Sequence, residues 1–126
     1  MRCQSPQLLQ QITTTVNNMG VDLFSPWIDT LQVDYLSWQI EIGAGATGTL
    51  TLQGTNQDNP NVNAPTNPIT LPAATPALTN PAGGAVNQIV SAPGLGVGGA
   101  RYQRLKYAFG SGNGKLNLWV TGAAKE

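Results

Sequence analysis

The stretch that decides the fold is Tyr35-Leu36-Ser37-Trp38-Gln39-Ile40-Glu41-Ile42, in which apolar and polar side chains alternate at every step. A period of two residues puts successive side chains on opposite faces of an extended chain. The stretch therefore predicts a half-buried β-strand. Its apolar face includes Trp38, which alternates with Leu36 and Ile40 and is expected in the core.

Three further stretches repeat this alternation. Residues 49–53 follow a glycine-rich link at 43–48, and residues 115–121 follow a turn at 111–114 that ends a strand over 101–109. In the later pair Leu105, Tyr107 and Phe109 share one face. Short links between alternating strands are typical of hairpins. We therefore expect two hairpins and an all-β fold, an antiparallel β-sandwich or jelly roll.

The rest of the chain carries weaker signals. Residues 1–20 are expected to form an N-terminal arm, with one helical turn near Ser5 and then an extended stretch, and residues 21–126 a single β-sandwich domain. Within that domain, residues 59–85 contain six prolines and predict a long extended Pro/Asn-rich loop. A short strand is expected at 86–90.

The charge content is low. Charged residues make up 10% of the chain, against about a quarter in a typical soluble domain. Six cations and six anions cancel, and a hydrophobic content of 40% argues against disorder. A surface this poor in charge suits a protein that is covered by other proteins, and it lacks the basic patch that nucleic-acid binding needs.

The few charges are unevenly placed along the chain. Five of the six acidic residues lie within residues 1–58, and five of the six basic residues lie within residues 101–125. Opposite charges on facing strands stabilise a sheet. We therefore expect early and late strands to lie side by side.

Two matches to G-x-G-x-x-G, at 43–48 and 94–99, carry no nucleotide site, because neither is followed by the helix that holds a pyrophosphate. The asparagines at 59, 61 and 63 lack the glycine and carboxylate of a calcium loop. With no histidine and one cysteine, a zinc site is excluded. No cofactor or metal is expected.

The sequence also has few side chains suited to catalysis. The chain has no imidazole base, and Cys3 has no candidate partner for catalysis or for a disulfide. Asp29 with Asp34 or Glu41 is the only carboxylate cluster. We expect these carboxylates to be exposed to solvent on the outward face of a strand. We expect no enzyme. No apolar run is long enough for a signal peptide or a membrane span, so no membrane partner is expected.

Aromatic and basic residues outside the core pattern are candidates for protein contact. Trp27 and Trp119 are either interface anchors or residues covered by a loop or by the arm. The strand beginning at Arg101 supplies cations, and the proline-rich loop supplies uncharged surface. The candidate contact residues are Trp27, Trp119, Arg101, Arg104, Pro65, Pro68 and Pro72.

The strand-and-turn features resemble those of small structural proteins of tailed phages. The resemblance lies in residues 37–40, in the run Gly48-Thr49-Leu50-Thr51-Leu52-Gln53-Gly54-Thr55-Asn56-Gln57-Asp58, in residues 101–107 and in residues 112–118. Such proteins are β-sandwiches or jelly rolls that decorate, cement or complete a capsid. The resemblance implies no catalytic residue, and the proline-rich loop has no counterpart in it.

These observations lead us to expect a virion structural protein. Its expected role is that of a capsid cement or decoration protein, made in the host cytoplasm and bound as a homo-oligomer to the major capsid protein. Two alternatives stay open: a carbohydrate-binding module or fibre tip, and the capsid or vertex subunit itself. Two or more aromatic rings on one exposed face would favour the carbohydrate-binding alternative.

Overall fold

The computed structural model describes residues 7–16, 18–31, 33–57, 68–71 and 77–124. These residues form nine strands and one short 3-10 helix, η1 (Leu95–Val97). No helix within these ranges is long and apolar enough to span a membrane. The strands are β1 (Gln7–Val16), β2 (Leu23–Phe24), β3 (Ile28–Asp29), β4 (Tyr35–Ile42), β5 (Ala46–Thr55), β6 (Ile69–Thr70), β7 (Val86–Pro93), β8 (Tyr102–Gly112) and β9 (Leu116–Ala124).

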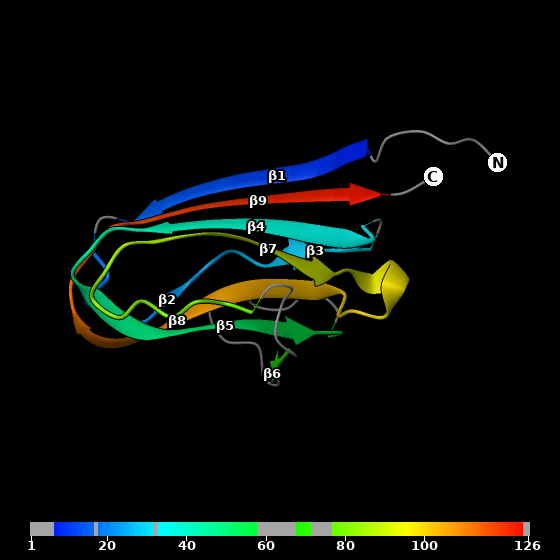
Figure 1. Ribbon diagram of the computed structural model, residues 1–126. Helices are drawn as coiled ribbons and strands as arrows, with labels where there is room; N and C mark the ends of the chain where they lie inside the picture. The colour runs from blue at the N-terminus through cyan, green and yellow to red at the C-terminus, as the bar shows by residue number, and fades with distance from the viewer. Residues whose placement is uncertain (1–6, 17, 32, 58–67, 72–76, 125–126) are drawn as a thin grey trace.

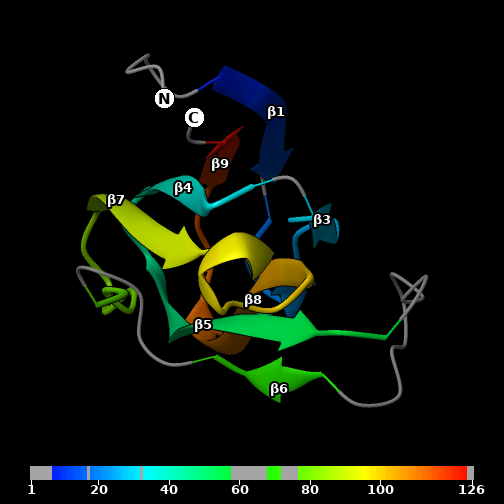
Figure 2. The same ribbon diagram turned by 90° about the vertical axis from the view of Figure 1, so that its right-hand side faces the viewer.

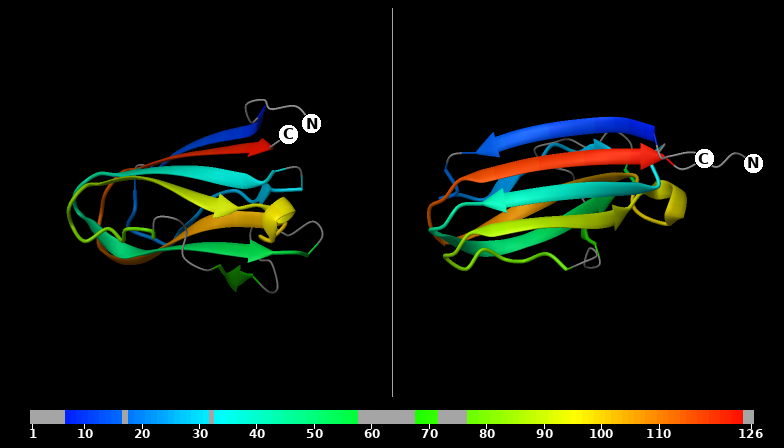
Figure 3. Two further views of the ribbon diagram at one scale, coloured as in Figure 1. Left: turned by 45° about the vertical axis from the view of Figure 1, so that its right-hand side comes forward. Right: turned by 45° about the horizontal axis from the view of Figure 1, so that its top comes forward.

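The strands lie in two antiparallel sheets that pack face to face (Figure 1). Sheet A has the order β1-β9-β4-β7, which the right-hand view of Figure 3 shows strand by strand. Sheet B has the order β2-β8-β5-β6, and β3 also pairs with β8. The expected all-β sandwich is therefore confirmed.

The strand order identifies the sandwich as a jelly roll. When β2 and β3 are taken as two parts of one interrupted strand, the described residues form eight strands, and these pair from the ends inward. β1 pairs with β9, β2 and β3 pair with β8, β4 pairs with β7, and β5 pairs with β6. This is a long antiparallel hairpin wrapped into two sheets, the double Greek key of a jelly roll.

Both predicted hairpins are wrong. β4 lies in sheet A and β5 in sheet B, and β8 lies in sheet B and β9 in sheet A. The short glycine-rich links therefore carry the chain from one sheet to the other instead of reversing it within a sheet. The strands that pair are β4 with β9 and β5 with β8, so early and late strands do lie side by side.

The two links pack against each other, and this close approach requires glycine at position 112. Gly43 donates its N–H to the carbonyl of Lys115 at 2.9 Å. A Cβ on Gly112, whose φ is +73°, would lie 2.0 Å from the carbonyl oxygen of Gly45. Only glycine fits this approach and this backbone conformation.

The core lies between the sheets and is built from the alternating strands. Trp38, Leu36 and Ile40 are fully buried, as the alternation predicts. The other buried apolar residues of the central strands are Ile42, Ala46, Leu50, Leu52, Leu105, Tyr107, Leu116, Leu118 and Val120. Phe109 differs from the prediction and is 41% exposed. It pairs with Gly48, directly beside the register shift between Thr47 and Gly48, and β8 is exposed from Phe109 to Gly112.

The first described segment is a strand throughout. Gln7–Val16 forms β1, so the helical turn expected there is wrong where the structure describes it. Hydrogen bonds to β9 across a sheet outweigh the weak helical signal, because threonine and valine at 13–16 favour extended chain. Met19 then enters the core, and its N–H bonds Asn113 Oδ1 at 2.8 Å.

The described parts of the proline-rich loop pair with β5. β6 pairs with Gln53 and Gly54, and the N–H of Leu71 bonds the carbonyl of Leu52 at 2.8 Å. Further on, Asn80 accepts the Leu50 N–H at 2.8 Å. The loop therefore covers the edge of its own sheet B along residues 68–71 and 80–83 (Figure 2).

Candidate functional site

A cation–aromatic cluster lies on the outer face of sheet B and consists of Phe24, Trp27, Gln53, Arg104 and Lys106. The Arg104 guanidinium carbon lies 4.2 Å from the centre of the Phe24 ring and 4.6 Å from that of Trp27. Its Nε donates a 2.8 Å hydrogen bond to Gln53 Oε1. The Lys106 ammonium lies 5.9 Å from the Phe24 ring centre. Arg104 is thus fixed between two rings.

Strand pairing brings these residues together from three parts of the chain. Arg104 lies opposite Gln53 of β5, and Lys106 lies between Thr51 of β5 and Phe24 of β2. Trp27 follows β2 after Ser25-Pro26. The N–H of Ser25 bonds the carbonyl of Leu105 at 2.9 Å, which holds this crossing segment against β8.

Burial sets the electrostatics of the cluster. Arg104 is only 5% exposed, and this desolvation lowers the pKa of its guanidinium from the ordinary value. Phe24, in contrast, is 48% exposed. The buried Nε1 of Trp27 has no hydrogen-bond partner among the described residues. The cluster therefore presents an open aromatic ring above a desolvated cation.

Arg101 lies just before β8 and extends this face. Its Nε is 3.6 Å from Asp29 Oδ1, and its guanidinium carbon is 5.0 Å from the centre of the Tyr102 ring. Asp29 also accepts the Leu31 N–H at 2.9 Å. The ion pair joins an early acidic strand to a late basic one, as the charge distribution predicts.

Trp119 lies on the opposite side of the molecule, on the outer face of sheet A. It is half-buried and directly opposite Gln39 of β4. A shallow groove here is lined by Ser37, Gln39, Glu41, Ile89, Trp119 and Thr121. Tyr35 of β4, 43% exposed, occupies the same face by strand alternation. The two tryptophans singled out as anchors therefore do not form one site.

The prolines proposed as contacts are only partly described. Pro68 is half-buried and directly precedes β6, on the edge of sheet B. Pro65 and Pro72 lie outside the described residues.

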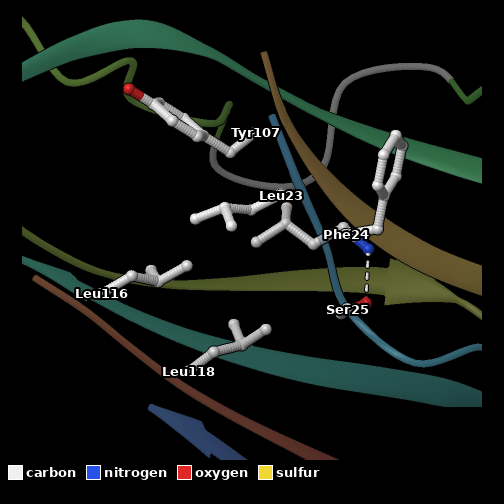
Figure 4. A pocket seen from close by; sticks show the side chains of 7 residues that line it. Leu23, Phe24, Ser25, Tyr107, Leu116 and Leu118 are labelled. Atoms are coloured by element: carbon white, nitrogen blue, oxygen red, sulfur yellow. Dashed lines mark hydrogen bonds between the residues drawn. The ribbon is translucent and has the colours of Figure 1, made fainter. Parts of the chain in front are cut away.

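An apolar pocket opens beside β2, between the sheets (Figure 4). Leu23, Leu116 and Leu118 face into it, and its volume is about 40 Å³. The Ser25 hydroxyl beside it accepts the Leu105 N–H at 2.8 Å. This space holds about one water-sized group, and an apolar lining keeps such cavities dry. The pocket is a packing gap rather than a ligand site.

Asp29 and Glu41 do not converge. Asp29 lies at the edge of sheet B, whereas Glu41 lies on the outer face of sheet A and accepts a 3.4 Å hydrogen bond from Gln39 Nε2. Within the described ranges no three metal-ligating side chains gather. The described surface thus offers contact chemistry, with aromatic rings, amides and a few cations.

The sequence pattern pointed to Trp27, Arg101 and Arg104 but missed Phe24, Gln53 and Tyr35. β2 has two residues, too few to show a period, so Phe24 gave no signal. Gln53 and Tyr35 lie at polar-facing positions of well-marked strands. Their partners across the sheet depend on strand pairing, which the pattern did not reveal.

Comparison with known proteins adds no family to this description. No family model matches the chain, and no curated protein or solved structure matches it either. The class defined by the fold is the antiparallel jelly roll.

Proposed function

We propose that this jelly roll is a virion structural protein, a capsid cement or decoration protein that stabilises a viral shell. It would be made in the host cytoplasm and would bind the major capsid protein as a homo-oligomer. Catalysis, cofactors, nucleic acid and membranes have no part in this role. The cation–aromatic cluster is its proposed contact surface.

The observation that carries the proposal is the fixed position of Arg104 between Phe24 and Trp27. Tryptophan, tyrosine and arginine dominate the binding energy of protein interfaces. Here the arginine is already ordered by two rings and by Gln53. Less side-chain entropy is lost on binding when the anchors are fixed beforehand. The exposed Phe24 ring supplies apolar area at the centre of the surface.

Two wider features support the same role. Jelly rolls recur in viral capsid proteins, although this support is an analogy between folds. Twelve charges on an exposed area of 6757 Å² leave large uncharged regions, which neighbouring subunits can cover at low desolvation cost. Many weak contacts made at once on one shell add up to tight attachment.

Mass spectrometry of purified particles with copy number tests the proposal directly. We expect the chain in the particle fraction at many copies. Purified chain should rebind particles stripped of it and raise their resistance to heat. Absence from every particle fraction would end the virion hypothesis. Assembly of the pure chain into closed shells would instead identify it as the shell subunit.

Rebinding also tests the contact surface. Phe24→Ala should weaken rebinding at least about tenfold, a loss of about 1.4 kcal/mol. Ile89→Ala is the matched control, because Ile89 is 60% exposed on β7 of sheet A and lies away from the cluster. If both variants rebind particles equally well, the contact surface is not the cation–aromatic cluster.

A second candidate function, carbohydrate binding, is favoured by one observation. Tyr35 and Trp119 lie on the same exposed face of sheet A, as a sugar-binding platform requires. Gln39, Glu41 and Thr121 line the groove beside Trp119 and can hydrogen-bond hydroxyl groups. Jelly rolls include lectins as well as capsid proteins.

Glycan-array binding tests this candidate. A carbohydrate-binding module should bind a defined set of glycans as a monodisperse protein, and Trp119→Ala should abolish that binding while Phe24→Ala leaves it intact. Absence of binding to every glycan would remove this candidate.

A further inference from the structure

β1 has a backbone edge that the described part of the chain leaves uncovered. It lies at the end of sheet A and pairs with β9 alone (Figure 3). Among the described residues, no backbone hydrogen bond forms on its other side. Such an edge presents a row of N–H and C=O groups to which another strand can bind.

The edges of sheet B, in contrast, are covered. β2 and β3 pair along the outer side of β8, and Asp22 accepts the Phe109 N–H at 2.7 Å. On the other side, β6 and residues 80–83 cover β5. β2, β3 and β6 have two residues each, and very short edge strands are poor templates for pairing.

The opposite edge of sheet A is also protected. The Gln88 side chain on β7 accepts the Thr79 N–H at 2.9 Å and donates to the Ala77 carbonyl at 2.7 Å, so it holds the loop against the strand. β7 ends at Pro93, which has no N–H to offer. Side chain, loop and proline together hinder the addition of a strand.

Among the described residues, no loop or side chain is seen to hydrogen-bond the outer edge of β1, and β1 is not short. It is ten residues long, and Gln7–Val16 contains no charged residue and no proline. Natural edge strands usually carry lysine, proline or an inward charge that prevents pairing. The long uncharged edge of β1 is therefore suited to pairing with another strand.

We propose that β1 pairs antiparallel with β1 of a second copy of this chain, across a two-fold axis. The two four-stranded sheets then join into one sheet of eight strands. Self-pairing covers both uncovered edges at once, whereas a strand from a different protein would bring a second edge of its own. No like charges meet, because residues 7–16 carry none. The dimer specifies the homo-oligomer of the proposed function, but a chain that dimerises without binding any particle would support the dimer and contradict only the capsid role.

Light scattering coupled to gel filtration, from about 1 μM to about 1 mM, tests the dimer. We expect a mass that rises from monomer to dimer with concentration, because one strand pair buries less area than a standard interface. Thr13→Lys with Thr15→Lys should raise the dimer Kd at least tenfold, since lysines on an edge strand hinder strand pairing and the dimer would carry four of them. Thr49→Lys with Thr51→Lys, on the outer face of β5, is the matched control and should leave the Kd unchanged.

A cysteine scan keeps the proposal testable if the lysine variant fails to fold. Single cysteines from Gln7 to Val16, in a Cys3→Ser background, should form interchain disulfides at one or two neighbouring positions near the axis. Facing residues of antiparallel strands have Cα atoms about 4.5–5.5 Å apart, within disulfide range. A monomeric mass at every concentration, with no crosslink at any position, would overturn the proposal.

Discussion

Arg104 is the residue whose surroundings are most specific. Two aromatic rings flank its guanidinium group, and Gln53 accepts a hydrogen bond from its Nε. A planar guanidinium stacks on rings and donates in a fixed direction, and an ammonium does neither. The cluster therefore depends on arginine and not on positive charge alone.

Arg104→Lys should lower the free energy of unfolding by about 1–2 kcal/mol, because stacking on two rings and one hydrogen bond are lost from a buried position. Chemical denaturation measures the change. Lys115→Ala removes an exposed cation and should stay within about 0.5 kcal/mol of the parent chain. A loss of equal size in both variants would mean that stacking contributes nothing.

Gly48 shows how closely β5 and β8 approach. A Cβ at this position would lie 2.4 Å from the Ala108 carbonyl oxygen and 2.4 Å from Cε1 of Tyr107. Gly48→Ala should therefore lower the free energy of unfolding by about 2–3 kcal/mol through overpacking. Gly84→Ala, where no atom lies within 4 Å, should be neutral or slightly stabilising. Thermal melts of the two variants compare them directly.

At the residue scale, the sequence was enough to select candidate contact residues, but it did not show which of them lie next to each other. Trp27 and Arg104 were both candidate contacts, yet nothing between positions 27 and 104 indicated that they stack. Their contact follows from the pairing of β2 and β3 with β8. Pairing between distant strands depends on the whole core, which no local pattern describes.

At the scale of elements, the alternation of apolar and polar residues predicted where most strands lie, but the strand pairs predicted from it were wrong. Residues 35–42 match β4 residue for residue, because a half-buried strand needs this pattern. The three residues between β4 and β5 fit a hairpin as well as a crossing between sheets. The crossing occurs because each apolar face must cover another one, which a flat pair of hairpins does not achieve.

An engineered disulfide distinguishes these two arrangements. Thr49 lies opposite Ala108 in the β5–β8 register. Thr49→Cys with Ala108→Cys, in a Cys3→Ser background, should therefore crosslink within one chain. The closed loop of about 60 residues should add up to about 4 kcal/mol to the free energy of unfolding. Mass spectrometry and chemical denaturation record the bond and its effect.

The control pairs Thr49→Cys with Gln39→Cys, which a β4–β5 hairpin would bring together. In the structure Gln39 lies on sheet A and Thr49 on sheet B, so no crosslink is expected. Efficient crosslinking of this control pair would mean that β4 and β5 form a hairpin after all.

At the scale of the whole molecule, zero net charge and exposed apolar residues make self-association easy. Leu31 and Val97 are 52% and 44% exposed. They lie at one end of the sandwich, where Thr30 Oγ1 accepts the Leu95 N–H at 3.1 Å. The exposed apolar side chains at this end can contact another copy.

Leu31→Glu with Val97→Glu should raise solubility, measured as the ammonium sulfate concentration that precipitates half of the protein. The free energy of unfolding should change by less than about 0.5 kcal/mol, because each side chain is already about half exposed to water. Leu31→Gln with Val97→Gln removes the same apolar area without adding charge. If the glutamine variant is as soluble as the glutamate variant, net charge is not the cause.

The pairing of early strands with late ones has a consequence during synthesis. β5 ends at Thr55, and its partner β8 begins only at Tyr102. A ribosome adding about 5–20 residues per second needs roughly 2–10 s to cover that gap. Throughout this interval the nascent chain exposes apolar strand faces that have no native cover, and chaperones bind such surfaces. We therefore expect sheet B to close only after β8 leaves the exit tunnel, and sheet A only after β9 does.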